Sequence, residues 1–140
     1  MAQTPPDAAL AELVCEYDSR WGRLDFEGLS RLWVRADPEP VYVGDEYAEP
    51  LVGADELDRH WARLSARVSE ASMSSTLHRA DVLDGGVVRC VLLCRWRLEA
   101  RGVGGAGEGA SWVTWLAVPR DGRYLIALHT ESEVHLAADG

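Results

Sequence analysis

The chain has 140 residues, of which 47% are hydrophobic and 26% are charged, and this length and composition predict one soluble globular domain spanning residues 1–140. The formal net charge of −9 argues against binding to nucleic acid or to an anionic membrane surface, because both need basic patches. All 14 positively charged side chains are arginine, which excludes a Schiff-base lysine, a pyridoxal phosphate anchor and a phosphate-loop lysine.

Residues 1–10 have neither a basic segment nor an apolar stretch as long as a signal peptide. No apolar run approaches the ~20 residues that span a bilayer. The three cysteines show no CxxC spacing, and Cys90 and Cys94 share a strand face too far apart to bridge. We therefore expect a cytoplasmic protein whose cysteines act as small hydrophobic side chains and not as catalytic thiolates.

Three amphipathic helices are predicted in the first half of the chain. The first has a capping threonine and two prolines at its start, and an aspartate-proline segment stops the second. A short strand and its return separate the second helix from the third. The predicted helices cover residues 4–21, 25–36 and 53–68, and the two short strands cover residues 41–43 and 47–52.

From Met73 onward the apolar residues follow a period of two, which is typical of strands. Asp84-Gly85-Gly86 and Asp121-Gly122 are typical of tight hairpin turns, and residues 102–109, with five glycines, predict a mobile hairpin tip. The predicted strands are 74–83, 87–100, 110–119 and 124–136. The fold class is therefore α+β, with a curved antiparallel sheet wrapped around three N-terminal helices to enclose a pocket.

The strand at 87–100 has two distinct faces. One is apolar and consists of Val88, Cys90, Leu92, Cys94, Trp96 and Leu98. The other carries Arg89, Arg95 and Arg97 beside Val87, Val91 and Leu93. Because a face that mixes arginine with aliphatic residues is too apolar for solvent alone, we expect a homodimer through this outer sheet face.

The order and spacing of these features resemble the nuclear-transport-factor-like superfamily, and within it the ketosteroid isomerase and SnoaL-like polyketide cyclase branch. The resemblance covers about residues 9–136. It rests on Tyr17 followed by Asp25, on Asp45 followed by Gly53, and on the run 122–136. It implies a cone-shaped fold that hosts cofactor-independent isomerases, cyclases, dehydratases and hydrolases, and also non-catalytic binding proteins.

By this resemblance Tyr17 would donate a hydrogen bond to a developing enolate oxygen, and Asp45 would be the proton-shuttling base. Thr114 would replace a protonated aspartate in the oxyanion hole, where a hydroxyl is a weaker donor than a carboxylic acid. Trp33 and Trp61 replace two supporting tyrosines, so the steroid isomerase network cannot form. Simpler alternatives are a core role for Tyr17 and a turn role for Asp45.

Glu131 takes the position of a pocket tryptophan on the last strand, and His129 shares its face. If both point inward, the pocket gains an imidazole beside a carboxylate. The spacing from the preceding turn favours this arrangement. The hydrophobic pattern favours the opposite one, because Tyr124, Ile126 and Leu128 are at least as apolar and would leave His129 and Glu131 facing solvent or a partner subunit.

Two further groups bear on the site. Among the six tryptophans, we expect Trp33, Trp61, Trp96 and Trp112 to line a flat apolar pocket, although tryptophans also fill large cores. On the third helix Trp61 fits the buried stripe better than its neighbour His60. The four histidines form no HExxH motif or close cluster, so no metal is expected.

Together these features predict an acid–base enzyme without a cofactor that acts on a hydrophobic polyketide-like or aromatic small molecule. The base would be Asp45, or His129 polarised by Glu131, and Tyr17 and Thr114 would donate to the oxyanion. The alternatives are a non-catalytic small-molecule binder and a dimerisation module with a vestigial pocket.

Overall fold

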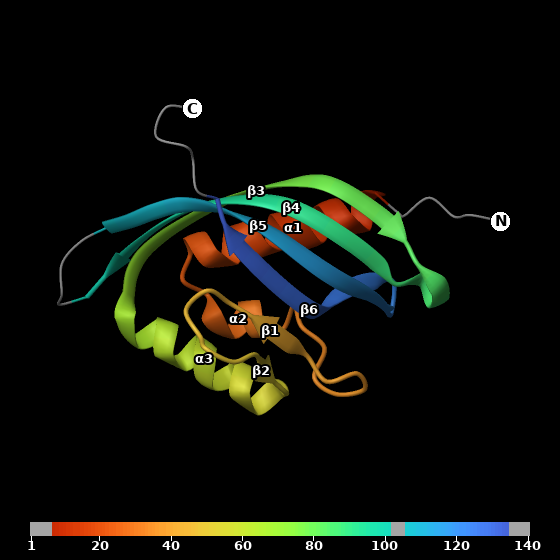
Figure 1. Cartoon of the computed structure of the whole chain (residues 1–140), viewed down its shortest axis with the longest axis horizontal. Coiled ribbons are helices and arrows are strands. Elements are labelled where there is room, and N and C mark those ends of the chain that lie inside the picture. The colour runs from red at the N-terminus through yellow and green to blue at the C-terminus, as the bar shows by residue number, and fades with distance from the viewer. Residues whose placement is uncertain (1–6, 102–105, 135–140) are drawn as a thin grey trace.

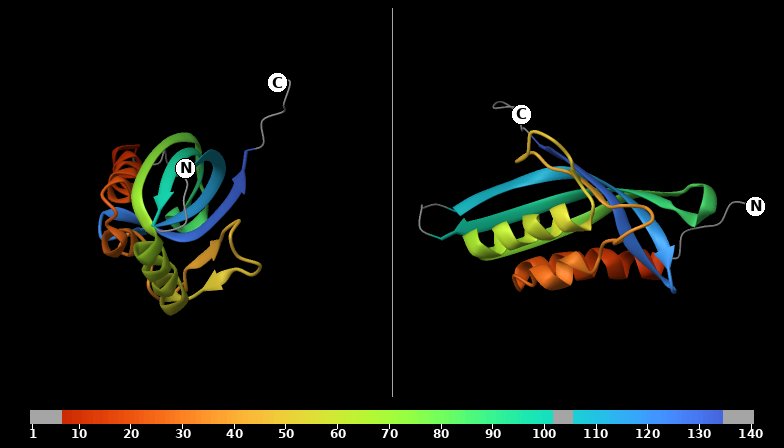
Figure 2. Two further views of the ribbon diagram at one scale, coloured as in Figure 1. Left: turned by 90° about the vertical axis from the view of Figure 1, so that its left-hand side faces the viewer. Right: turned by 90° about the horizontal axis from the view of Figure 1, so that it is seen from below.

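The computed structural model describes residues 7–101 and 106–134. Its six strands form one curved sheet in the order β2-β1-β6-β5-β4-β3, and the sheet bends around the helices (Figures 1 and 2). The elements are α1 (Asp7–Gly22), α2 (Phe26–Ser30), β1 (Val41–Val43), β2 (Leu51–Val52), α3 (Ala54–Arg67), β3 (Val68–Val82), β4 (Val88–Ala100), β5 (Ala106–Arg120) and β6 (Arg123–Glu133). The predicted α+β architecture is confirmed. The predicted helix start at residues 4–6, part of the hairpin tip and the strand end at residues 135–136 lie outside the described residues.

The sheet is mixed and not wholly antiparallel. Strands β3 to β6 form an antiparallel meander, whereas β1 pairs in parallel with β6 and antiparallel with β2. The parallel pairing sets Tyr42 directly beside His129. Two residues that are far apart in the sequence are thereby brought to one position on the sheet.

Two predicted boundaries are wrong for identifiable reasons. Helix α2 ends at Ser30 and not near residue 36, because the following chain pairs with β6: the Ile126 N–H donates to the Leu32 carbonyl at 2.8 Å. Strand β3 begins at Val68 and not at residue 74, directly after α3. Its first half is rich in small polar residues, which obscure the period of two, although it pairs with the end of β4 after a register shift between Val68 and Glu70.

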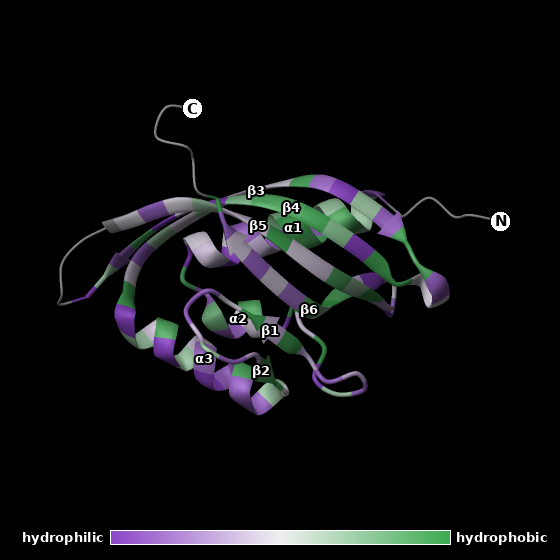
Figure 3. Cartoon of the chain, viewed as in Figure 1, coloured by the Kyte–Doolittle hydropathy of each residue, from purple (hydrophilic) through white to green (hydrophobic). Residues whose placement is uncertain are grey.

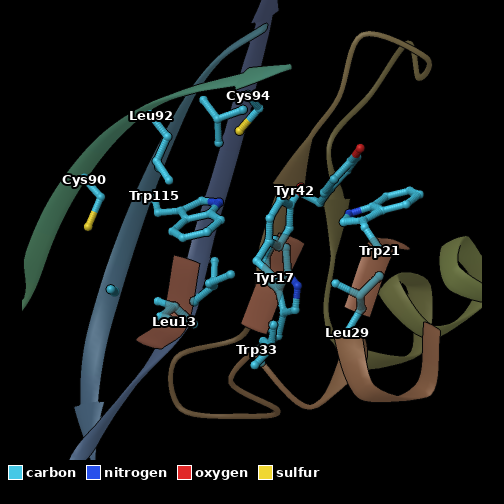
Figure 4. Close-up of a cluster of buried hydrophobic side chains, with 14 of the residues drawn as sticks. Leu13, Tyr17, Trp21, Leu29, Trp33, Tyr42, Cys90, Leu92, Cys94 and Trp115 are labelled. Carbon is cyan, nitrogen blue, oxygen red and sulfur yellow. The ribbon is translucent and has the colours of Figure 1, made fainter. Parts of the chain in front are cut away.

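The concave face of the sheet and α1 enclose the core (Figure 4). The predicted apolar face of β4 points inward, and Cys90, Leu92 and Cys94 are fully buried. Burial raises the pKa of both buried thiols to about 11, so they stay protonated, as expected of structural cysteines.

The hydropathy colouring in Figure 3 shows polar residues alternating with apolar ones along β3 and around α3. Within the described residues no helix is long and apolar enough to cross a membrane.

A β-bulge in β6 reverses the direction of its side chains. Leu128 pairs with Leu116 while Ile126 pairs with Ala117, so Ala127 is an extra residue. Before the bulge Ile126 faces the core; after it His129 does, and both are almost fully buried. The reading that turns His129 and Glu131 inward is therefore correct after the bulge, and the opposite reading is correct for Tyr124 and Ile126 before it but wrong for Leu128.

Candidate functional site

A cavity of about 330 Å³ lies between the concave face of the sheet and the helices, a volume within the usual range of small-molecule sites. Its aromatic lining residues are Tyr17, Trp21, Trp33, Tyr42, Trp61 and Trp96. Four carboxylate residues also line it: Asp45, Glu46, Glu131 and Glu133. The remaining lining residues are His129, Ser111, Leu64, Met73, Cys94, Leu98 and Val113. Figure 4 shows Tyr17, Trp21, Trp33 and Tyr42 converging from α1, β1 and the segment after α2.

Most of the sequence-predicted site residues are brought together at this cavity. They come from both helices and strands, and three of them are tryptophans. The residues concerned are Tyr17, Asp45, His129, Glu131, Trp33, Trp61 and Trp96. The roles assigned to them from the resemblance remain predictions.

Thr114 and Trp112 do not line the cavity, and the prediction that they do is wrong. Side chains along a strand alternate between the two faces of the sheet. Because Trp115 is fully buried, Val113 also faces inward, and Trp112 and Thr114 face outward. Thr114 pairs with Thr130 on the convex side. Trp112 is 41% exposed. Thr114 therefore cannot supply an oxyanion hydrogen bond.

His129 is held between two hydrogen-bond partners in the cavity wall. The Trp115 Nε1 atom donates to His129 Nδ1 at 3.0 Å, and His129 Nε2 lies 2.8 Å from Glu131 Oε1. An indole nitrogen can only donate, so Nδ1 accepts and Nε2 carries the proton that is donated to Glu131. This pattern selects the neutral Nε2–H tautomer of His129.

The tautomer decides which group can take a proton from a ligand. Neither nitrogen of His129 has a free lone pair, since Nδ1 already accepts the indole hydrogen. An imidazolium would set a second N–H against the indole N–H. Glu131, which accepts from Nε2, is therefore the basic end of the Trp115–His129–Glu131 chain.

Three donors stabilise the ionised form of Glu131. Besides His129, the Tyr42 hydroxyl lies 3.2 Å from Oε1 and the Asp45 backbone N–H lies 3.4 Å from Oε2. Burial by itself would raise the pKa of Glu131, but these hydrogen bonds and the imidazole outweigh burial and hold its pKa below the ordinary value. Asp45, predicted as the base, contributes its backbone N–H, while its side chain is at the exposed mouth of the cavity.

Tyr42 links Glu131 to a second carboxylate that the sequence did not single out. Its hydroxyl lies 3.2 Å from Oε1 of Glu46 and 3.2 Å from Oε1 of Glu131, and its single hydrogen can serve only one of them. Burial, followed by the charge of Glu131, raises the pKa of Glu46. Two neighbouring carboxylates whose pKa values shift in opposite directions are suited to acid and base roles.

Gly44 makes this close arrangement possible. A Cβ atom at this buried position would collide with both the Tyr42 ring and the Glu46 carboxylate. The glycine therefore lets the loop after β1 fold back, so that Glu46 reaches the hydroxyl of a residue four positions earlier. The only sequence signal for this pair was the Gly44-Asp45-Glu46 turn.

Tyr17 approaches from α1 and packs edge-to-face on Trp115, with ring centroids 5.0 Å apart. Its pKa is raised well above the ordinary value by burial, and further by the neighbouring Cys94 and Glu131. The phenol stays protonated at neutral pH and can act as a hydrogen-bond donor toward the cavity.

His60 is buried together with Trp61, although it was expected to be displaced from the interior. The Tyr47 hydroxyl lies 2.7 Å from His60 Nδ1. The Tyr42 ring lies between His60 and His129, at centroid distances of 4.6 Å and 4.8 Å. Burial lowers the pKa of His60 to about 4, so it is neutral at physiological pH and supports Tyr42 by packing.

Within residues 7–101 and 106–134, no group of three or more His, Cys, Asp or Glu side chains is arranged to hold a metal ion.

No family model matches the chain, and no curated protein matches it in sequence. Solved structures share its fold. A ketosteroid isomerase-like protein from Erwinia carotovora is 15% identical, with 92% of this chain and 96% of that chain covered at a TM-score of 0.76. A proposed scytalone dehydratase from Novosphingobium aromaticivorans is 11% identical, with 92% and 84% covered at a TM-score of 0.81.

A third similar structure is a proposed dehydratase of the NTF2-like family from Streptomyces avermitilis. It is 19% identical, with 94% of this chain and 100% of that chain covered at a TM-score of 0.72. At such identities the likeness concerns the fold. The chain thus has the cone-shaped α+β fold of nuclear-transport-factor-like and ketosteroid isomerase-like proteins, as the resemblance in its sequence predicts.

Proposed function

We propose that the protein is a cofactor-independent acid–base enzyme that acts on a small hydrophobic ring compound. The observation that carries this proposal is the hydrogen-bond chain from Trp115 through His129 to Glu131, which ends in a carboxylate at the wall of an apolar cavity. The ketosteroid isomerase-like and dehydratase-like structures of the same fold support an enzymatic use of the cavity. The roles proposed for Glu131 and Glu46 rest on the geometry of this chain, and that of Tyr17 follows the resemblance in the sequence.

In the proposed reaction Glu131 removes a proton from a carbon next to a carbonyl group. The electron pair of the broken C–H bond moves toward the carbonyl oxygen, where Tyr17 donates a hydrogen bond to the developing oxyanion. Glu46, which retains its proton more readily than Glu131, returns a proton to the product. The proton taken up by Glu131 then passes to Glu46 through the Tyr42 hydroxyl, which lies 3.2 Å from both carboxylates, and this restores the starting state. Isomerisation, cyclisation and dehydration of carbonyl compounds all begin with the first of these steps.

A test reaction can be chosen without knowing the natural substrate. 5-Nitrobenzisoxazole is a bicyclic compound in which a base removes the C3 proton while the N–O bond breaks, forming a nitrile and a phenolate whose absorbance is measured. The wild-type chain should accelerate this elimination beyond what free acetate achieves. Glu131→Gln should lower the rate constant by ~10²-fold or more, the usual effect of a general base.

The matched control is Glu12→Gln, an exposed change on α1 that removes the same charge, and it should leave the rate unchanged. Equal rates for wild type and Glu131→Gln would refute Glu131 as the base. If ring compounds bind the cavity and no elimination exceeds the acetate rate, the protein is a binder and not an enzyme.

A further inference from the structure

We propose that the ligand of this cavity is a cationic amine carried on an aromatic or polycyclic ring body. The inference takes from the proposed function only that the cavity is the ligand site, and it adds the charge of the ligand. It rests on the charged groups of the lining, on its aromatic walls and on buried donors without partners.

The charge of the lining has one sign. Four acidic residues line the cavity: Asp45, Glu46, Glu131 and Glu133. No arginine is among the lining residues. Of the four acidic residues, Asp45 and Glu133 are exposed and supply negative charge at the mouth, whereas Glu46, also exposed, is the acid that retains its proton more readily. A carboxylate ligand would be repelled there, whereas a protonated amine would be attracted.

The protein's own arginines do not neutralise these four residues. The ion pairs formed by arginine within residues 7–101 and 106–134 involve other acids: Glu16, Asp25, Glu27, Asp58, Asp81 and Glu99. Although the chain has 14 arginines, none of these ion pairs involves a carboxylate of the cavity. A cationic ligand can therefore pair with these carboxylates.

The deeper walls fit the ring body of such a ligand. Six aromatic side chains line the cavity, and their faces bind flat apolar rings as well as cations. The indole nitrogens of Trp21, Trp33 and Trp61 are buried and have no hydrogen-bond partner among the described residues. All three tryptophans line the cavity, and a lone-pair acceptor on the ring body would satisfy whichever of these donors it reaches.

The experiment compares three probes that share one ring body and carry a cationic, a neutral or an anionic group: (6-methoxynaphthalen-2-yl)methylamine, the corresponding alcohol, and 6-methoxy-2-naphthoate. All three probes have the same methoxynaphthalene ring, and its methoxy oxygen is the lone-pair acceptor. Dissociation constants are measured with the whole chain by titration calorimetry at neutral pH. The amine should bind at least about tenfold more tightly than the alcohol, which corresponds to ~1.4 kcal/mol, and the naphthoate should bind least. The advantage of the amine should shrink as salt is added.

Two variants locate the effect at the mouth. Asp45→Asn and Glu133→Gln should each reduce the amine-to-alcohol preference by about two- to fivefold, the size expected for a partly exposed charge pair. Glu12→Gln, which removes the same charge far from the mouth, should not change it. Tighter or equal binding of the alcohol or naphthoate, or no binding of the amine, overturns the inference.

The outcomes for charge and for catalysis can be told apart. If Glu131→Gln abolishes the elimination of 5-nitrobenzisoxazole while the alcohol binds as tightly as the amine, the acid–base proposal is supported and the proposal of a cationic ligand is refuted. If the amine is preferred and no variant affects elimination, the cavity is a cation-binding site without the proposed base.

Discussion

Trp115 determines the chemical role of His129, because its indole hydrogen occupies the one nitrogen that could otherwise act as a base. The bond from Trp115 Nε1 to His129 Nδ1 is 3.0 Å long and fully buried. A carboxylate beside an imidazole usually suggests a histidine base. The buried indole transfers the basic role to Glu131, and Trp115 is therefore a positioning residue that acts through His129.

Replacing Trp115 with Phe should release the Nδ1 lone pair and allow His129 to change tautomer or take up a second proton. In the wild-type chain the ¹⁵N spectrum of neutral His129 should show the proton on Nε2 and none on Nδ1, as the two hydrogen bonds require, and the variant should lose this pattern. The substitution should also cost about 1–3 kcal/mol of unfolding free energy, since it removes a buried hydrogen bond and part of a ring.

Trp96→Phe is the matched control for that experiment, because Trp96 Nε1 donates to the Ser111 hydroxyl at 3.3 Å and not to a histidine. It should leave the His129 spectrum unchanged. An unprotonated Nε2 in the wild-type protein would contradict the assignment of Glu131 as the base.

The lowered pKa of Glu131 sets the expected pH dependence. Because the folded state favours the ionised carboxylate, the proton-abstraction rate should be constant at neutral pH and fall only below the ordinary glutamate pKa of about 4.3. The same shift stabilises the fold above the unfolded-state pKa, and this contribution is lost as pH falls through the folded-state pKa. A pH–rate profile, with circular dichroism to monitor folding, tests this; a midpoint above the ordinary glutamate range would contradict it.

At the scale of elements, the loop after β1 is held in place by α3. The Tyr47 hydroxyl lies 2.7 Å from His60 Nδ1 and accepts from Arg63 Nη2 at 2.8 Å. The Arg63 guanidinium also lies over the Tyr47 ring, 5.2 Å from its centroid. These contacts fix the loop that carries Asp45 and Glu46 to the cavity mouth.

Tyr47→Phe should loosen this loop while keeping the ring. It leaves His60 Nδ1 buried without its partner, which should cost ~1–3 kcal/mol of unfolding free energy, and the backbone amides of Asp45 and Glu46 should exchange hydrogen faster. Denaturant unfolding and hydrogen exchange measure the two effects. Val52→Ala, an exposed change on β2, serves as the control, and unchanged exchange in Tyr47→Phe would show that the loop is fixed by other contacts.

At the scale of the whole molecule, we propose that the protein forms a homodimer through the convex face of the sheet. On this face half-buried Val91 and Leu93 lie between exposed Arg89 on one side and exposed Arg95 and Arg97 on the other. Trp112, which is 41% exposed, packs against His78 on the same face with ring centroids 5.2 Å apart. A large aromatic surrounded by arginine and aliphatic residues is typical of interface centres.

Trp112→Glu should convert the dimer to a monomer, because it removes the large aromatic contact at the centre of the interface and puts a charged group in its place. Sedimentation equilibrium measures the association state across protein concentrations. Val52→Glu places the same charge at an exposed apolar position on the edge strand β2 and should leave the dimer intact. A wild-type chain that remains monomeric at high concentration would contradict the proposal.

Local patterns in the sequence were sufficient to predict the fold class. The period of two along 87–100 correctly assigned Cys90, Leu92 and Cys94 to the inner face, and the Asp121-Gly122 turn correctly separated β5 from β6. These features depend on neighbouring residues, because the alternation of a strand and the backbone of a tight turn are set within a few positions.

The site depended on contacts between distant segments, which no local pattern contains. The extra residue at Ala127 turned His129 and Glu131 inward, and the pairing of β1 with β6 placed Tyr42 against them. The sequence by itself determined which residues alternate along each strand. Only the tertiary structure decided where that alternation breaks and which side chains meet there, because bulges and parallel pairings are selected by packing across the whole sheet.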